Sequence, residues 1–160
     1  DLWSAVNSAL QLRGQDTGDN LARVMVNSTV GLLGLVDVAS DLQVQRHSAN
    51  FGLTLGRWGV QPGPYLVLPV LGPSTVRDSL ALPVDWQGNV VNHLDDAAVR
   101  NEMTLLNLIG KRASYLDAGE MLEQAALDKY SFVRDAFLQR RRNQVYDGNP
   151  PDEEEEPGAP

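Results

Sequence analysis

The residues that could do acid–base or metal chemistry are few and lie far apart along the chain. Two histidines occur, His47 and His93, and cysteine is absent, so the chain offers no thiolate zinc site, iron–sulfur cluster or cysteine nucleophile. His93 precedes Asp95 and Asp96, which together could hold a metal ion, but no His-Glu-x-x-His motif is present. We favour a solvated helix start for this segment over a metal site.

Nucleophile and cofactor motifs are equally sparse. No Gly-x-Ser-x-Gly elbow occurs, and Gly110-Lys111-Arg112 lacks the upstream glycine of a phosphate-binding loop. Ser74-Thr75 follows Gly72-Pro73, and we expect this pair to cap a helix rather than to supply a nucleophile. Gly31 and Gly34 indicate close helix packing rather than a cofactor site. The sequence therefore predicts no catalytic residue, no cofactor and no metal site.

Charge divides the chain into a nearly neutral body and an acidic end. The 160 residues carry a net charge of −8 with a pI of about 4.6, which argues against binding to nucleic acid. Six of the 21 acidic residues lie within residues 147–160. We expect one domain over residues 1–146 and a disordered, solubilising tail over residues 147–160, rather than a docking tail. Because the first residue is Asp1 rather than Met, we expect a piece of a longer protein.

The first third of the chain predicts two helices. Apolar residues at helical spacing indicate a short amphipathic helix over residues 2–12. Residues 14–18 read as a break, in which Asp16 or Thr17 caps the second helix. The second helix continues into 13 uncharged residues between Arg23 and Asp37, too few to cross a bilayer. This stretch suits a buried helix or one that lies in a membrane interface.

The middle of the chain lacks charge over residues 58–76, a stretch of 19 residues that contains four prolines and three glycines. Prolines break a continuous helix, so we reject a membrane span. A non-helical backbone is tolerated at membrane depth only inside protein or beside a wet cavity, so this segment is an apolar core loop or lines a cavity. We expect residues 64–70 to be extended and residues 73–80 to form a helix with Pro73 in its first turn.

The last third predicts three helices. They cover residues 92–112, a segment after a capping box at residues 117–120, and a segment opened by Asp128. In the last helix we expect Tyr130, Val133 and Phe137 to face inward, with Arg134 and residues 140–142 outward. Since no repeat and no clear strand alternation occur, the predicted fold class is mostly α.

Three segments carry a resemblance to a known family. The first contains Asn27-Ser28-Thr29, Gly31, Gly34, Asp37 and Ala39. The second joins residues 51–60, FGLTLGRWGV, to residues 63–69, GPYLVLP, and residues 72–78, GPSTVRD. The third contains Asp128, Tyr130 and residues 133–140, VRDAFLQR. In these segments the chain resembles the MlaA (VacJ) family of bacterial outer-membrane lipoproteins.

The resemblance implies a ring-like arrangement of amphipathic helices in the inner leaflet of the outer membrane, beside a trimeric porin. Family members remove misplaced phospholipids from the outer leaflet and pass them to the periplasmic carrier MlaC. An inner-membrane ATP-binding-cassette complex receives them, and no bond chemistry is involved. Three features depart from the family: neither the lipidated cysteine nor the Phe-Asn-Arg segment that normally follows it is among these residues, and Lys129 replaces a proline.

The resemblance also nominates residues for particular roles. Candidates for the lipid path or for gating are Gly59, Gly63, Tyr65, Leu66 and Leu68. The candidates for contact with the carrier are Arg134, Arg140 and Arg141. The residues that form the structural motif are Asn27, Gly31, Gly34, Asp37, Phe51, Gly52, Gly56, Pro64, Pro69, Arg77 and Asp78.

Each nominated role has a structural alternative. Gly59 and Gly63 fit a fixed tight turn as well as a moving gate. For Tyr65, Leu66 and Leu68 we favour packing in the core over contact with acyl chains. For Asp37, Arg77 and Asp78 we favour ion pairs over exposure to lipid headgroups. Solvation alone explains the arginine cluster at residues 140–142.

Three functions from different classes follow. The first is a phospholipid-translocating component, which the resemblance favours. The second is a helical adaptor that binds a porin and moves no lipid. The third, which we rank last, is a metal-dependent hydrolase that uses Asp95, Asp96 and Glu102.

Overall fold

The computed structural model describes residues 1–31, 36–69, 71–89, 92, 97–99, 101–110, 113 and 128–151. Its elements are α1 (Leu2–Leu10), α2 (Gly14–Thr29), α3 (Val38–Asp41), α4 (Phe51–Arg57), β1 (Tyr65–Leu68), β2 (Gly72–Thr75), α5 (Val76–Gly88) and α7 (Lys129–Val145). Residues 97–99, 101–110 and 113 are also helical. The mostly α fold class predicted from the sequence is confirmed.

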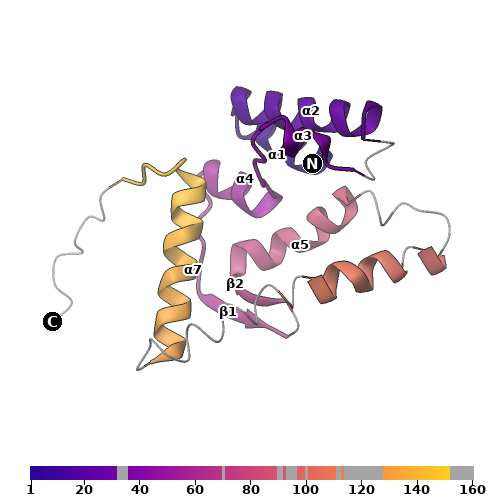
Figure 1. Cartoon of the computed structure of the whole chain (residues 1–160). Helices are drawn as coiled ribbons and strands as arrows, with labels where there is room; N and C mark the ends of the chain where they lie inside the picture. The colour runs from indigo at the N-terminus through magenta and orange to yellow at the C-terminus, as the bar shows by residue number, and fades with distance from the viewer. Residues whose placement is uncertain are drawn as a thin grey trace, which may run out of the picture.

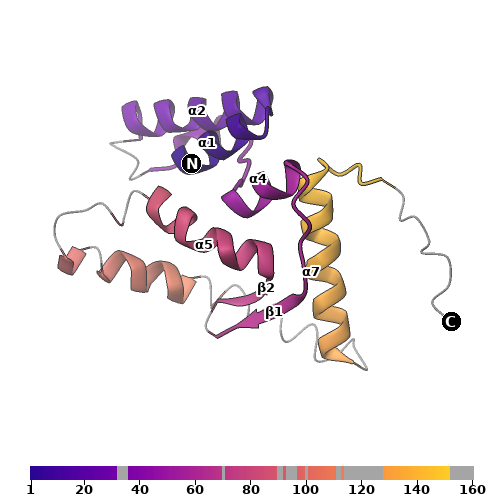
Figure 2. The same ribbon diagram turned by 180° about the vertical axis from the view of Figure 1, so that it is seen from behind.

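Helix α4 occupies the centre of the arrangement. As Figure 1 shows, α1, α2 and α3 lie together on one side of α4, while α5 and the strands lie on the other. Helix α7 runs past the end of α4 and past the hairpin, an order that the view from behind repeats (Figure 2). Residues from the start, middle and end of the chain therefore meet around α4.

The connection between α1 and α2 is shorter than the sequence suggested. Leu12 adopts a φ of 59°, and the Arg13 and Leu12 amides donate to the carbonyls of Ser8 and Ala9. These two hydrogen bonds form a Schellman motif, which reverses the chain within three residues. Helix α2 consequently starts at Gly14, so the predicted break over residues 14–18 is wrong.

A two-stranded hairpin forms where the sequence indicated one extended segment. Tyr65–Leu68 pairs antiparallel with Gly72–Thr75, in a register that places Val67 opposite Pro73. Proline is tolerated here because a two-stranded sheet consists of edge strands. The extended segment is confirmed in part, but the helix start at Pro73 is wrong, because α5 begins at Val76 with Thr75 as its cap.

The predictions for the last helix are mostly confirmed. The Asp128 carboxylate caps α7 by accepting hydrogen bonds from the Tyr130 and Ser131 amides at 3.0 and 3.3 Å. Val133 and Phe137 are half-buried as expected, whereas Tyr130, which was also predicted to face inward, is 57% exposed near the start of α7. Residues 97–99 and 101–110 confirm part of the predicted helix over residues 92–112, whereas the predicted capping box at residues 117–120 lies outside the described residues.

Polarity is inverted in the described part of the molecule. Its buried hydrophobic residues are four alanines with Leu53 and Val145, whereas ten buried residues are polar or charged. Large apolar side chains are instead exposed along α1, α2, α5 and residues 101–110, as Leu80 at 73% and Leu106 at 68% illustrate. Patches of this kind mark surfaces that contact lipid or protein. Among the described helices, none is long and apolar enough to cross a bilayer.

Candidate functional site

An ionic triad joins α5 to α7. The Arg77 Nη2 atom lies 3.1 Å from Asp78 Oδ1, and Arg141 Nε lies 2.7 Å from Asp78 Oδ2. All three side chains are at least 88% buried. Burial alone would raise the pKa of Asp78, but the hydrogen bond and charge of Arg141, followed by those of Arg77, hold that pKa below its usual value. The triad thus carries two cations and one anion.

The triad corrects one prediction and confirms another. The sequence predicts that Arg141 points outward with its neighbours, but its side chain is only 12% exposed because it reaches Asp78. The preference for ion pairing at Arg77 and Asp78 is confirmed. The exposed arginine of the three carrier-facing candidates is Arg140, while Arg134 is half-buried and pairs with Asp135 at 2.8 Å.

Two motif glycines allow the triad to approach α4. A Cβ atom on Gly52 would lie 2.6 Å from Asp78 Oδ1, and one on Gly56 would lie 2.6 Å from Arg77 Nη1. Asn50, which caps α4, also accepts a hydrogen bond from Arg141 at 3.3 Å. The motif segment FGLTLGR therefore forms a helix whose glycine face is covered by charged side chains.

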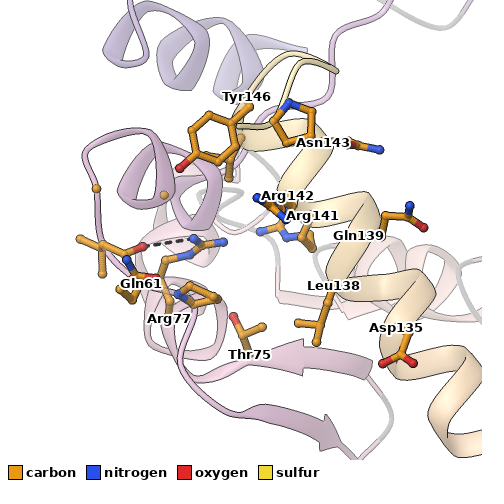
Figure 3. Close-up of a pocket in the computed structure, with 16 residues that line it drawn as sticks. Gln61, Thr75, Arg77, Asp135, Leu138, Gln139, Arg141, Arg142, Asn143 and Tyr146 are labelled. Atoms are coloured by element: carbon orange, nitrogen blue, oxygen red, sulfur yellow. Dashed lines mark hydrogen bonds between the residues drawn. The ribbon is translucent and has the colours of Figure 1, made fainter. Parts of the chain in front are cut away.

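A cavity of about 820 Å³ opens beside this triad, between the end of α4, the start of α5 and the C-terminal half of α7. Figure 3 shows the side chains of Arg77, Arg141 and Arg142 converging on it from two elements. Gln61 and Asn143 add amide groups, and Leu138 adds apolar surface. The cavity lining thus combines charged, amide and apolar groups.

The loop over residues 59–63 forms one wall of this cavity. Gly59 has a φ of +92° and ends α4 in a Schellman motif, in which Val60 N donates to Leu55 O and Gly59 N to Gly56 O, both at 3.0 Å. Gly63 has a φ of +67°. The Arg77 amide donates to Pro62 O at 3.1 Å and ties the loop to α5. Both glycines therefore hold left-handed backbone conformations, and that of Gly59 closes α4.

Among the hairpin candidates, Tyr65 packs against α7. The Tyr65 ring packs edge-on against Tyr130 and Phe137, with ring centroids 5.8 and 5.9 Å apart. Burial, followed by Tyr130, raises the pKa of Tyr65. Leu66 and Leu68 are half-buried. The packing of Tyr65 agrees with the role that the sequence analysis favoured, while the roles of Leu66 and Leu68 stay predictions.

The remaining proline and aromatic motif residues lie at the ends of elements. Pro64 and Pro69 flank β1 and are exposed. Phe51 begins α4, and its ring packs edge-on against Trp58 at a centroid distance of 6.2 Å. These residues set the bounds of α4 and β1.

A second ionic cluster joins α2 to α3. Arg23, which is 99% buried, donates to both Asp37 oxygens at 2.7 and 2.8 Å and to Val44 O at 2.6 Å. Asn27 donates to Asp37 and accepts from the Ala39 amide. Hydrogen bonds from Ser40 and Asn27, with the charge of Arg23, lower the pKa of Asp37 to about 2.

This cluster explains part of the motif. The pairing predicted for Asp37 is confirmed, and Asn27 helps to orient it. Gly31 is buried where a Cβ atom would collide with the Val36 and Asn27 carbonyls, whereas Gly34 lies outside the described residues.

Sequence reasoning missed Arg13, which holds the end of α7. Its guanidinium donates to the carbonyls of Gln144 and Val145 at 2.6 and 3.2 Å and lies 2.6 Å from Asp147. A cation is favourable there because the C-terminal end of a helix carries partial negative charge. Arg23 was likewise missed as the partner of Asp37. Both arginines were missed because neither contact leaves a local signal in the sequence.

The hydrolase hypothesis receives no support. His93, Asp95 and Asp96 lie outside the described residues, and Glu102 is exposed on a helix. Among the residues that the structure describes, no cluster of three potential metal ligands occurs.

The chain matches a known protein family over most of its length. A family model described as MlaA lipoprotein matches residues 1–144. The chain belongs to the MlaA lipoprotein family. This is a family of lipoproteins rather than of enzymes, in agreement with the prediction that the chain is not an enzyme.

Curated relatives support the assignment. The intermembrane phospholipid transport system lipoprotein MlaA of Escherichia coli is 36% identical over 124 residues, which cover 76% of this chain and 49% of that protein. An uncharacterized protein of Rickettsia felis is 44% identical over 143 residues, 89% of this chain and 57% of the relative. The chain thus spans about half the length of the curated relatives it matches.

A solved structure extends the MlaA match to the fold. This structure, described as "Structural basis for maintenance of bacterial outer membrane lipid asymmetry", superposes with a TM-score of 0.72 at 30% identity. The match covers 92% of this chain and 73% of the solved one. The helical arrangement in Figure 1 is therefore that of a known relative.

Proposed function

We propose that this chain is part of an outer-membrane lipoprotein that takes misplaced phospholipids from the outer leaflet and passes them to a periplasmic carrier, thereby maintaining lipid asymmetry. The observation that carries the proposal is the inverted polarity of a chain that belongs to the MlaA family. The curated relatives are named as phospholipid transport lipoproteins.

The physical argument rests on the two-sided chemistry of a phospholipid. Its acyl chains need apolar surroundings, which exposed side chains such as Leu80, Trp86 and Leu106 offer. Its headgroup needs polar groups shielded from hydrocarbon, which the arginine-lined cavity offers. A molecule that is apolar outside and polar within supplies both.

Partners and local roles extend the proposal. We assign the porin and the carrier MlaC as neighbours, with Arg134 and the exposed Arg140 facing the carrier. Leu66 and Leu68 contact acyl chains at the edge of the hairpin, beside Tyr65. The loop between Gly59 and Gly63 regulates entry to the cavity that it lines.

A transfer assay tests the function. Vesicles that carry the chain and its porin, together with a fluorescent phospholipid, are mixed with MlaC, and the label bound to MlaC is measured. We expect transfer that depends on the chain. Binding to the porin without transfer, in an assay where the Escherichia coli relative does transfer lipid, would instead identify a structural adaptor.

The loop is tested by Gly59→Ala. Alanine at a positive φ is strained by about 1 kcal/mol, so stability falls in any case. If the loop regulates entry, the transfer rate per folded molecule also changes. An unchanged rate in the folded variant assigns Gly59 to the helix end alone.

A further inference from the structure

We propose that His47 holds the segment between α3 and α4 against α2 in a proton-dependent manner, through a clamp that consists of His47, Asp16 and Asp19. The inference goes beyond the proposed function and does not rest on it. In the sequence no carboxylate lies three or four positions from His47. The fold instead brings two carboxylates to the ring from another element.

Both nitrogen atoms of the His47 ring meet a carboxylate oxygen. The Nε2 atom lies 3.0 Å from Asp19 Oδ2, and the Nδ1 atom lies 3.4 Å from Asp16 Oδ1. The two aspartates are three positions apart in α2 and therefore share one face of that helix. All three side chains are partly buried, with exposed fractions of 22–32%. The ring thus lies between two anions that one helix fixes in place.

The charge of the ring decides how many of these contacts are hydrogen bonds. Neutral imidazole carries a proton on one nitrogen, and its other nitrogen presents a lone pair. A neutral ring can therefore keep one contact, while its second nitrogen faces a carboxylate as acceptor against acceptor. Imidazolium donates from both nitrogens and adds a positive charge to both contacts. The clamp is therefore strong only when the ring is protonated.

The clamp acts on residues 44–50, which have no regular secondary structure. Two buried side chains of α2 already bind the backbone of this segment, because Arg23 donates to Val44 O at 2.6 Å and Asn20 donates to His47 O at 2.9 Å. The segment ends at Asn50, which caps α4. His47 thus adds a titratable contact to the connection between α2 and α4.

Other charged groups lie near the ring and oppose or favour its positive charge. Those that line the same cavity of about 1050 Å³ are Arg13, Arg46, Arg57, Arg140, Asp16 and Asp147. Arg13 and Arg57 pair with Asp147, Arg46 pairs with Asp1, and Asp16 also lies 3.7 Å from Arg13. Arg140 is exposed, where water and salt screen its charge. The two carboxylates in direct contact are therefore the main influence on the ring.

The sign of the pH effect follows from these contacts. Histidine in general loses its proton between about pH 5 and 8, whereas aspartate stays charged over that range. Because the protonated ring makes both contacts, the clamp stabilises the fold in the acid part of this range. That contribution is lost as the pH rises and the ring becomes neutral.

The test compares His47→Gln with the wild-type chain at about pH 5.5 and about pH 8, on either side of the range in which histidine titrates. Glutamine keeps an N–H donor but cannot become charged, so the variant represents the neutral ring. Urea unfolding of the full chain gives the equilibrium constant of unfolding. The ratio of the two constants at each pH cancels the titration of every group that both chains share.

We expect His47→Gln to raise the unfolding constant about fivefold at the lower pH and less than about twofold at the higher pH. The loss is modest because a charge-assisted contact is weakened by partial exposure. In double-mutant cycles, Asp19→Asn should remove most of the difference between the two pH values. Asp41→Asn is the matched control, because Asp41 is exposed on α3, and it should leave that difference unchanged.

Hydrogen exchange supplies a local readout of the same clamp. A peptide that covers residues 44–50 should exchange faster in His47→Gln than in the wild type at the lower pH, and at the same rate at the higher pH. A peptide from α7 should exchange alike in both chains, because the clamp does not include that helix.

A ratio of unfolding constants that is equal at both pH values, or larger at the higher pH, would overturn the proton-dependent clamp. If His47→Gln does not fold, Asp19→Asn alone replaces it, and its effect should likewise be greater at the lower pH. Equal effects of Asp19→Asn at both pH values would also overturn the clamp. None of these measurements involves lipid transfer, so the clamp and the proposed function are tested separately.

Discussion

At the scale of single residues, the motif glycines and the buried charges depend on one another. Gly52 and Gly56 leave room for Asp78 and Arg77, so the charged groups lie directly on the surface of α4. Gly18, in contrast, lies in α2, where a Cβ atom would meet no heavy atom within 4 Å. The same residue type therefore has opposite consequences at the two positions.

Gly56→Ala should destabilise the protein by about 1–3 kcal/mol, because its Cβ atom overlaps Arg77 and Val145 in a packed site. Gly18→Ala is the matched control and should stabilise it by about 0.5–1 kcal/mol, since alanine is the better helix former. Urea unfolding monitored by circular dichroism checks both. Equal effects of the two substitutions would contradict the packing argument.

The lowered pKa of Asp37 predicts that the folded chain loses stability in acid. Its pKa is about 2 in the folded chain against an ordinary value of 3.8, so it stabilises the fold fully above pH 3.8. That contribution is lost as the pH falls from 3.8 towards 2. Unfolding measured at several pH values should show the decline, and Asp37→Asn should reduce its slope. An unchanged slope would mean that other carboxylates dominate.

At the scale of elements, the sequence predicted features that depend on neighbouring residues and missed features that lack a clear local signal. Asp128 precedes an amphipathic pattern and caps α7 as expected, because capping depends on neighbouring residues. The start of α2 was missed because Leu12, rather than glycine, takes the left-handed conformation between α1 and α2. The hairpin was missed because each strand has four residues, too few to establish an alternating pattern.

The candidate site divides in the same way. The motif residues of the site were found through the family resemblance. Ion pairing was predicted for Asp37, Arg77 and Asp78, but not all of their partners were named. Their partners Arg23 and Arg141 depend on how α2, α5 and α7 are placed in space. No spacing rule along the chain links Asp78 to a residue 63 positions later.

Arg13 offers a test of how α7 is held. Arg13→Gln takes away the charged donor that binds the Gln144 and Val145 carbonyls, and it breaks the ion pair with Asp147. We therefore expect the free energy of unfolding to fall by about 1.5–3 kcal/mol. Arg46→Gln is the control, because Arg46 is 68% exposed where it meets Asp1 and should matter by less than about 1 kcal/mol. Thermal unfolding of both variants checks the difference. Similar losses would show that α7 is held mainly by other contacts.

At the scale of the whole molecule, the exposed apolar side chains predict association with lipid. Leu106→Asp replaces an apolar residue that is 68% exposed, and we expect at least about tenfold weaker binding to phosphatidylcholine vesicles. Asn101→Asp, on the same helical segment, adds the same charge at an exposed polar position and should change binding little. Vesicle flotation measures both, and equal effects would attribute the loss to charge alone.

The inverted polarity also bears on how the chain responds to temperature. The change in heat capacity on unfolding grows with the apolar surface that becomes exposed and is reduced by polar surface. Since alanines and hydrogen-bonded polar groups fill most of the described interior, unfolding exposes little new hydrocarbon. Calorimetry should therefore find a heat-capacity change below the usual value of about 12–15 cal/mol/K per residue. Stability would then vary with temperature along an unusually flat curve.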